Sequence, residues 1–264
     1  MTRASTDGVQ SVGRALSLLQ ILAESPADCS LSDLTRQAKL PPSTVHRLLN
    51  SLVQAGYASQ NPITARYGLG NNLIVLSRKA AQKHQLIQIA RPYLEELALQ
   101  VGETANLTTR QDDMVIQLDH VDSPNILRVT YPVGERFPLH ASASGKLFLA
   151  FLPPETRDQI LKSKRRAFTA ATLTDREKLL RELEVIRQRG YSIDDAEREI
   201  GVRCVAAPVR NQRGQVVAAI SLTGPTLRVT TARLHELATV LMKTAQTISE
   251  VWSGSSIGVP SSAR

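Results

Sequence analysis

Four hydrogen-bonding side chains lie on one face of a short amphipathic segment, and their types suit the recognition of base pairs. At about 100° per residue, the apolar stripe of this segment consists of Val45, Leu48, Leu49 and Leu52. The opposite face carries Ser43, Arg47, Asn50 and Gln54, and the residues that flank it are Thr44 and His46. Arginine pairs with guanine O6 and N7 in the major groove, asparagine and glutamine pair with adenine N6 and N7, and serine or threonine can hold phosphates. The segment therefore predicts a helix that reads double-stranded DNA.

The charge pattern around this segment indicates a polyanionic partner. Between Asp33 and Glu95 the chain runs for 61 residues without one Asp or Glu, where its average acid content predicts about five or six. Residues 1–94 carry ten Lys or Arg against four Asp or Glu, whereas residues 95–264 carry 22 against 20. A local positive field favours approach to phosphates through counterion release. The cations of the acid-free stretch are Arg36, Lys39, Arg47, Arg66, Arg78, Lys79, Lys83 and Arg91.

These eight cations are expected to differ in role according to their position. Arg47 is assigned to base edges, and Arg66 to a minor-groove or phosphate contact from a neighbouring hairpin. Arg36 and Lys39 are expected to bind phosphates. The other four cations are predicted to lie too far along a connecting helix to touch DNA. Their expected role is only to keep that flank free of negative charge. They are Arg78, Lys79, Lys83 and Arg91.

Three helices and a hairpin must position the DNA-reading side chains. Helical apolar spacing begins at Ser11 and ends before Pro26, a second helix is predicted over residues 31–38, and two prolines separate it from a third helix at 43–54. Residues 57–60 and 65–69 can pair as strands around the turn 61–64. This order predicts a winged helix-turn-helix DNA-binding domain at residues 10–70. Winged helices also dock proteins, and that alternative stays open.

The remainder of the chain predicts a second, α+β domain. Helices are expected at 71–83, 85–100, 142–152, 154–161, 175–189 and 230–251. Strands are expected at 104–109, 114–121, 126–131, 191–194, 202–209 and 216–223. A sheet with helices on its faces accounts for this order. The domains are therefore expected to be a linker helix at 71–83, an α+β domain at 84–252, and a flexible tail at 253–264.

Metal, disulfide and membrane chemistry are not indicated. The only cysteines, Cys29 and Cys204, belong to no Cys/His cluster, so the sequence predicts no disulfide framework, no metal site and no cofactor. The first ten residues lack the apolar core of a signal peptide, and no window approaches the roughly 18 uninterrupted apolar residues of a membrane span. A cytoplasmic protein without a membrane partner is expected.

Two catalytic motifs are present only in part. The pair Gly145-Lys146 ends like a phosphate-binding loop, but Leu147 replaces the required Ser or Thr. The pair His235-Glu236 opens a zinc-protease motif, but Thr239 stands where the second histidine is needed. The chain is therefore not expected to be an enzyme. The alternative is a small-molecule-transforming enzyme whose winged helix docks a protein.

Four sequence blocks carry a resemblance to a known family. They are SVGRALSLLQIL, STVHRLLNSLVQAGY, PLHASASGKLFLA and DDAEREIGVRCVAAPVRNQRGQVVAAISLTGP. In this order and spacing they resemble the IclR family of bacterial transcriptional regulators over about residues 10–252. The resemblance implies a winged-helix domain, a linker helix, a GAF-like effector domain, and dimers or dimers of dimers on palindromic operator DNA.

The resemblance also implies an effector pocket in the second domain. The matching positions are Ser142, Ala143, Gly145, Asp194, Val202, Cys204, Ser221 and Thr223. Independently of the family, Ser142 precedes a predicted helix whose N–H groups could receive a carboxylate. Ser221 and Thr223 share one face of a predicted strand by alternation and add hydroxyls. A small organic acid is therefore the expected effector, and its identity is open.

Ordinary structural roles compete with ligand binding at several of these positions. Ser142 alone is typical of a helix N-cap, and Cys204 alone of a small buried hydrophobe. Asp194 would repel an acid unless it accepts from a ligand hydroxyl or binds the backbone. Ala196 stands where relatives commonly carry a glutamate beside Glu197, so the pocket edge is expected to differ. The expected function is a ligand-responsive repressor or activator of a metabolic operon, in which the effector biases an equilibrium between DNA-competent and incompetent arrangements.

Overall fold

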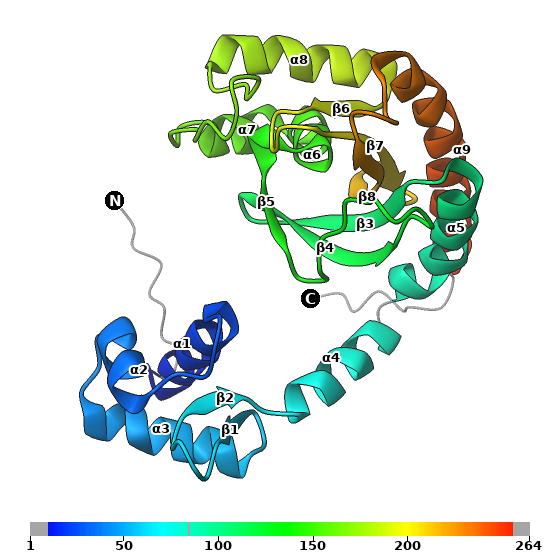
Figure 1. The fold of residues 1–264 in the computed structure, drawn as a ribbon. Coiled ribbons are helices and arrows are strands. Elements are labelled where there is room, and N and C mark those ends of the chain that lie inside the picture. The colour runs from blue at the N-terminus through cyan, green and yellow to red at the C-terminus, as the bar shows by residue number, and fades with distance from the viewer. Residues whose placement is uncertain (1–9, 84, 256–264) are drawn as a thin grey trace, which may run out of the picture. The chain divides into compact units, whose positions relative to one another are not determined.

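A computed structural model describes residues 10–83 and 85–255, which form two compact units that divide after Lys83. The first unit is built from helices α1 (Gln10–Glu24), α2 (Leu31–Ala38) and α3 (Pro42–Gln54), followed by α4 (Asn72–Lys83) (Figure 1). Helices α1 to α3 pack around a small apolar core in which Leu18, Leu34 and Leu49 are fully buried. The helix-turn-helix therefore has its own hydrophobic core.

Local sequence signals end α2 and start α3. Ser30 caps α2, because its Oγ accepts a hydrogen bond from the backbone N–H of Asp33 at 3.2 Å. Lys39 ends the helix in the left-handed region at φ 54°. Pro42 then occupies the first turn of α3, where its missing N–H costs no helical hydrogen bond. These residues set the turn that orients the predicted recognition helix.

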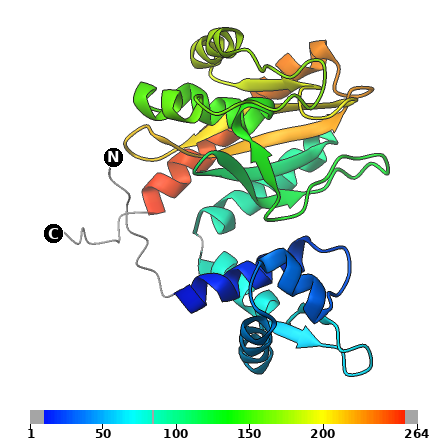
Figure 2. The ribbon, with the colours of Figure 1, turned by 90° about the vertical axis from the view of Figure 1, so that its left-hand side faces the viewer.

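A short hairpin forms the predicted wing. Strand β1 (Ala58–Gln60) pairs antiparallel with β2 (Tyr67–Leu69), and Tyr67 exchanges two backbone hydrogen bonds with Cys29 at 2.8 and 2.9 Å. Figure 2 shows the hairpin projecting from the helices of this unit. A side chain at Gly70 would lie 2.2 Å from the carbonyl oxygen of Gly56, so only glycine fits where the hairpin ends.

An antiparallel six-stranded sheet forms the centre of the second unit. Its strand order is β5-β4-β3-β8-β7-β6. The strands are β3 (Thr104–Gln111), β4 (Met114–Val121), β5 (Arg136–Pro138), β6 (Ser192–Asp195), β7 (Val202–Arg210) and β8 (Val216–Pro225). Helices α5 (Gln85–Val101) and α9 (Thr231–Ser255) cover one face, as Figure 1 shows. The other face packs against the short helix η1 (Leu139–Ala141), α6 (Ala143–Phe151) and α8 (Arg176–Arg189), with α7 (Pro154–Ile160) following α6.

Strand alternation separates two cores on the two faces of the sheet. Leu107, Val205 and Leu222 belong to the core beneath α5 and α9. Ala206 and Ala219 lie on the opposite face, in the core that includes α6 and α8. Each strand therefore presents alternate residues to α6, and these residues decide what that face can bind.

Two expectations from the sequence are wrong. Residues 126–131 form no strand, and Ile126 is 98% exposed; the edge position beside β4 is taken by β5, with Met114 opposite Pro138. Tertiary pairing here overrides local β-propensity.

The helix α9 continues through Ser255, beyond the predicted start of the tail at residue 253, because Trp252 still packs against the core. The rest of that tail, residues 256–264, lies outside the described residues. None of the described helices is both long and apolar enough to cross a membrane.

Candidate functional site

The predicted recognition face is present and exposed on α3. Val45 and Leu49 are fully buried in the core of the first unit, which fixes the rotation of the helix about its axis. Thr44 is half-buried, and the remaining members of the face are exposed, namely Ser43, His46, Arg47, Asn50 and Gln54. Within this face, His46 Nδ1 and Asn50 Nδ2 lie 3.5 Å apart, one helical turn from each other. The structure thus brings the sequence-predicted DNA-reading side chains together on one free surface.

The predicted phosphate and wing contacts have neighbours within the first unit. Arg36 is 77% exposed and pairs with Asp33 at 2.8 Å, so part of its charge is already balanced. Lys39 is exposed at the left-handed residue that ends α2. Arg66 is exposed and donates to the carbonyl oxygen of Asp28 at 2.8 Å. This contact ties the wing to the loop before α2.

The remaining cations of the acid-free stretch are not part of the exposed face of α3 or of the wing, and the side chains of two of them are not described. Arg91 lies in the second unit and pairs with Glu95 at 2.8 Å and Asp119 at 3.0 Å. Lys79 is exposed on α4, and the side chains of Arg78 and Lys83 lie outside the described part of the chain. Arg91 therefore balances neighbouring carboxylates.

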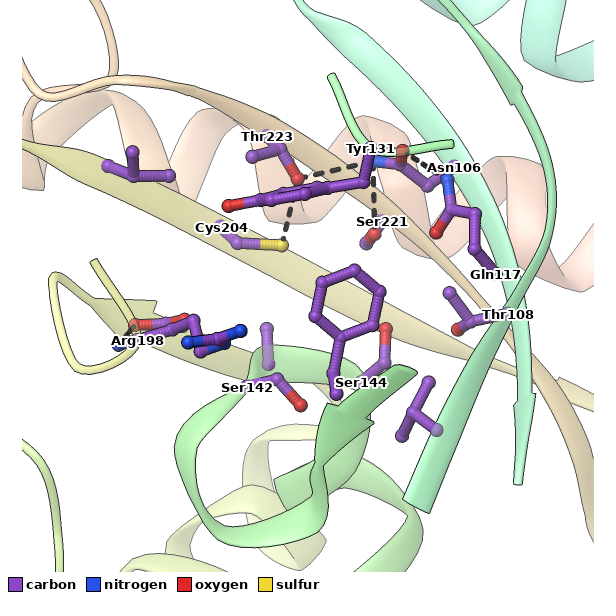
Figure 3. Close-up of a pocket in the computed structure, with 15 residues that line it drawn as sticks. Asn106, Thr108, Gln117, Tyr131, Ser142, Ser144, Arg198, Cys204, Ser221 and Thr223 are labelled. Atoms are coloured by element: carbon purple, nitrogen blue, oxygen red, sulfur yellow. Dashed lines mark hydrogen bonds between the residues drawn. The ribbon is translucent and has the colours of Figure 1, made fainter. Parts of the chain in front are cut away.

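The second unit contains a cavity on the sheet face that packs against α6 (Figure 3). Its empty space, the open mouth included, is about 470 Å³. Elsewhere this face is apolar, with Ala206 and Ala219 fully buried. Around the cavity the same face is largely polar. The lining residues are Asn106, Thr108, Val115, Gln117, Tyr131, Phe137, Ser142, Ala143, Ser144, Asp194, Arg198, Val202, Cys204, Ser221 and Thr223.

A chain of hydrogen bonds crosses the polar wall of the cavity. Asn106 Nδ2 donates to Thr223 Oγ1 at 3.1 Å and to Ser221 Oγ at 3.4 Å, and Gln117 Nε2 donates to Asn106 Oδ1 at 2.8 Å. Thr223 Oγ1 in turn donates to Cys204 Sγ at 3.3 Å (Figure 3). Burial of polar groups is costly unless they are hydrogen-bonded, and an apolar wall would serve packing alone. This network therefore indicates a wall shaped for a polar ligand.

The N-terminus of α6 forms a second polar part of the cavity. Ser142 caps the helix, because its Oγ accepts from the N–H of Gly145 at 3.2 Å and donates to the carbonyl oxygen of Pro138 at 3.0 Å. Its hydroxyl is thus occupied by capping. The N–H groups of Ala143 and Ser144 open the helix, where no acceptor within the helix is available, and both residues line the cavity. A carboxylate would be favoured at this position.

Gly145, which was expected to contact the effector, is not among the lining residues. It packs against η1, where a Cβ atom at this position would lie 2.5 Å from the carbonyl oxygen of Leu139. The residue is therefore required for the close approach of η1 and α6. Gly145 therefore matches the family pattern because of packing. A motif match alone does not show whether a residue packs or contacts a ligand.

Asp194 lines the cavity with its carboxylate held by the backbone. Its Oδ1 accepts from the N–H of Glu197 at 2.7 Å and from that of Arg198 at 3.4 Å. Burial, and then the charge of Glu197, raise the pKa of Asp194 to about 7. Near neutral pH the carboxyl is therefore partly protonated, which reduces the repulsion expected between Asp194 and an acidic ligand.

The raised pKa of Asp194 predicts a pH-dependent stability. Because the pKa of Asp194 in the folded protein exceeds the ordinary aspartate value of 3.8, this stability contribution is full below about pH 4 and is lost as pH rises through about 7. Asp194→Asn keeps an oxygen acceptor but cannot ionise, so we expect the free energy of unfolding of the wild type to fall relative to this variant over that range. Urea titrations at pH 5, 6, 7 and 8 measure the difference, and Asp113→Asn, at an exposed position, serves as the control. A constant difference between wild type and Asp194→Asn would contradict the assignment.

Two aromatic residues that sequence reasoning missed cover part of the cavity. Tyr131 and Phe137 contact edge to face, with ring centroids 5.0 Å apart. The hydroxyl of Tyr131 donates to Glu199 Oε2 at 3.3 Å, and burial raises the pKa of Tyr131 so that the phenol stays neutral. The other missed lining residues are Asn106, Thr108, Val115, Gln117, Ser144 and Arg198. Strand alternation on β3 could have indicated Asn106 and Thr108, because they alternate with the buried apolar residues Ala105 and Leu107.

Comparisons with protein families cover both units. The model described as IclR helix-turn-helix domain matches residues 11–62, and the model described as bacterial transcriptional regulator IclR C-terminal matches residues 78–250. The chain belongs to the IclR family. Members of the IclR family are transcriptional regulators and not enzymes, so the predicted regulatory function is confirmed. The predicted α+β fold with an N-terminal helix-turn-helix is confirmed as well.

Individual IclR-family relatives align over nearly the whole chain. The transcriptional repressor IclR of Escherichia coli is 36% identical over 256 residues, which are 96% of this chain and 93% of the relative. The crystal structure of an IclR regulator from Alicyclobacillus acidocaldarius superposes with a TM-score of 0.85 at 29% identity, over 94% of this chain and all of the other. An IclR homologue from Microbacterium hydrocarbonoxydans, solved in complex with 4-hydroxybenzoate, superposes with a TM-score of 0.82 at 28% identity, over 93% of this chain and all of the other.

The effector positions implied by the IclR resemblance mostly meet in one place. Seven of the eight line the cavity, although they come from α6, β6, β7 and β8 and the residue that caps α6. Asp194 lies opposite Cys204 in the register of β6 and β7, and Cys204 lies opposite Thr223 in that of β7 and β8. Their contact with an effector stays a prediction.

Proposed function

We propose that this regulator changes its affinity for operator DNA when a small organic acid enters the cavity beside α6. The observation that carries the proposal is the buried polar wall of Asn106, Gln117, Ser221 and Thr223, which faces the N-terminus of α6 across a cavity. Such a site offers hydroxyl and amide partners at one end and helix N–H groups for a carboxylate at the other. The effector then biases an equilibrium between arrangements that bind DNA well and poorly.

The relatives support an organic acid and repression. The Microbacterium homologue is complexed with 4-hydroxybenzoate, an aromatic acid, and the Escherichia coli relative is named a repressor. We therefore place this chain among regulators of a metabolic operon, with repression as the first expectation. The protein would act in the cytoplasm, where operator DNA is found.

The operator is proposed to be palindromic and bound by a dimer or a dimer of dimers. In that arrangement residues 10–70 bind DNA, the linker helix 71–83 connects, and residues 84–252 bind the effector and associate. The division of the described residues after Lys83 supports a boundary at the end of α4. Two recognition helices related by a two-fold axis would then read half-sites about one helical turn apart.

DNA recognition is tested at the recognition helix. Arg47→Ala is expected to weaken operator binding by about 1 to 3 kcal/mol, because a bidentate contact to guanine is lost. Fluorescence anisotropy with a duplex from the promoter of the chain's own gene measures the affinity at fixed salt concentration. Lys79→Ala, an exposed cation on α4 with no assigned DNA contact, is the control and should bind as the wild type does. Unchanged affinity of Arg47→Ala would contradict the assignment of α3.

A further inference from the structure

We propose that Arg198 is the counter-charge for the effector's carboxylate and the residue that selects acids over their uncharged analogues. The inference rests on the proposed function of the cavity as the effector site. Arg198 follows β6, in the turn that begins at Asp194, and Figure 3 shows its side chain directed into the cavity. Among the described residues that line the cavity, it is the only lysine or arginine.

Within the part of the chain that the structure describes, no carboxylate pairs with the guanidinium of Arg198. Its Nε is buried and has no hydrogen-bond partner across residues 10–83 and 85–255. Buried polar atoms are nearly always satisfied, so an orphaned donor beside a cavity indicates a partner that binds there. A carboxylate is the partner that an arginine fork fits best.

An aromatic contact holds Arg198 in place while leaving its donors unused. The Cζ atom of Arg198 lies 4.6 Å from the centroid of the Phe168 ring, within the range of a cation–π interaction. This contact acts through the face of the guanidinium and uses none of its N–H groups. Arg166 also contacts Phe168, with its Cζ 5.2 Å from the same centroid, but Arg166 is not among the residues that line the cavity.

The positive charge of Arg198 is the main charge that a ligand in the cavity would meet. Lys146 is matched by Glu197 in a buried ion pair, and neither residue lines the cavity. Burial raises the pKa of Cys204 to about 12, so the thiol is neutral, and Tyr131 is neutral for the same reason. Among the carboxylates that line the cavity in the described residues, only Asp194 opposes Arg198, and its pKa of about 7 leaves it partly protonated near neutral pH. The cavity therefore favours an anion.

The cavity wall opposite Arg198 indicates a second polar group on the ligand. Figure 3 shows Gln117 and Thr108 on the side of the cavity away from Arg198, beside the hydrogen-bonded group of Asn106 and Ser221. These amides and hydroxyls can donate to and accept from a hydroxyl or oxo group. The geometry thus points to a small carboxylic acid with a second polar group at its far end.

The test compares carboxylates with their amides, which have nearly the same shape but no charge. Titration calorimetry on the full chain uses acetate with acetamide, pyruvate with pyruvamide, and 4-hydroxybenzoate with 4-hydroxybenzamide. We expect the wild type to bind at least one acid more than tenfold tighter than its amide, as a charge-assisted pair of hydrogen bonds would give. Arg198→Met is expected to weaken the acid by roughly tenfold or more and to leave the amide within about threefold.

Two further variants keep the result interpretable. Arg166→Met removes the other cation beside Phe168 and should keep the wild-type preference for the acid. Arg198→Lys keeps a charge without the bidentate fork and should restore part of the preference. All variants should show the thermal unfolding of the wild type.

Three outcomes would overturn the role of Arg198. They are an Arg198→Met variant that still prefers the acid, equal losses for acid and amide, and a wild type with no preference for any acid. The first two leave the carboxylate to the N–H groups at the start of α6, and the third leaves the cavity to an uncharged effector. Acid binding that neither Arg198→Met nor Thr223→Val alters would instead place the ligand outside the cavity and contradict the proposed function itself.

Discussion

Lys146→Met is expected to lower the free energy of unfolding of the second unit by about 3 to 5 kcal/mol, because it leaves a buried carboxylate without its counter-charge. The side chain of Lys146 is 1% exposed, that of Glu197 is 8% exposed, and their ion pair joins α6 to the turn after β6. Burial raises the pKa of Glu197 even beside this lysine, and its Oε2 has no hydrogen-bond partner. The single tryptophan, Trp252, packs on the core of this unit, so its fluorescence in urea follows the transition.

A double variant separates lost charge balance from lost packing. Lys146→Met with Glu197→Leu replaces the buried pair by apolar side chains and should recover most of the loss, since desolvation offsets much of the attraction within such pairs. Lys164→Met, at an exposed position, should change little. The loss in Lys146→Met should also shrink at pH 5, where Glu197 protonates more readily. A double variant no more stable than the single one would refute this account.

Leu49→Ala is expected to destabilise the first unit by about 2 to 5 kcal/mol and to abolish operator binding at ambient temperature. Leu49 is fully buried on the underside of α3. Among the described residues, its core has only eight buried members, so a small unit loses much of its stability with one side chain. Hydrogen exchange measured by mass spectrometry should show loss of protection in peptides of α1 to α3. The peptides of β3 and β8 should keep theirs, because they belong to the other unit.

The control for Leu49→Ala is Leu69→Ala on β2, where the leucine is 43% exposed. This variant removes the same atoms from a position that is already partly hydrated, so protection across the first unit should stay much closer to that of the wild type. Equal loss of protection in both units of Leu49→Ala would contradict the independence of the two cores.

The recognition helix could be predicted from sequence because its signals are local. The spacing of Val45 and Leu49 fixes which face of α3 is buried, and the opposite face must then contain Arg47 and Asn50. The prolines before the helix and the cap at Ser30 act within one turn. No long-range contact is needed to infer this surface.

The cavity depends on pairings that are remote in sequence. Asn106 reaches Ser221 across 115 residues because β3 and β8 are neighbours in the sheet. The resemblance to a family identified Ser221 and Thr223, but it gave no sign of Asn106, Gln117 or Arg198. It also could not separate Gly145, which packs against η1, from residues that face the cavity.

Sequence by itself determined the predicted recognition helix and its exposed polar face, the hairpin beside it, the positive charge of the first third, and the family. The first three follow from periodicity, capping and composition, which act between residues close along the chain. The family follows from the resemblance of four sequence blocks in their order. Only the tertiary structure decided which β-branched run becomes a strand and that Lys146 is buried against Glu197, 51 residues away. It also decided that Arg198 enters the cavity with an unpartnered Nε. Burial and pairing depend on which elements meet in the sheet, and the residues of one segment do not encode its distant neighbours.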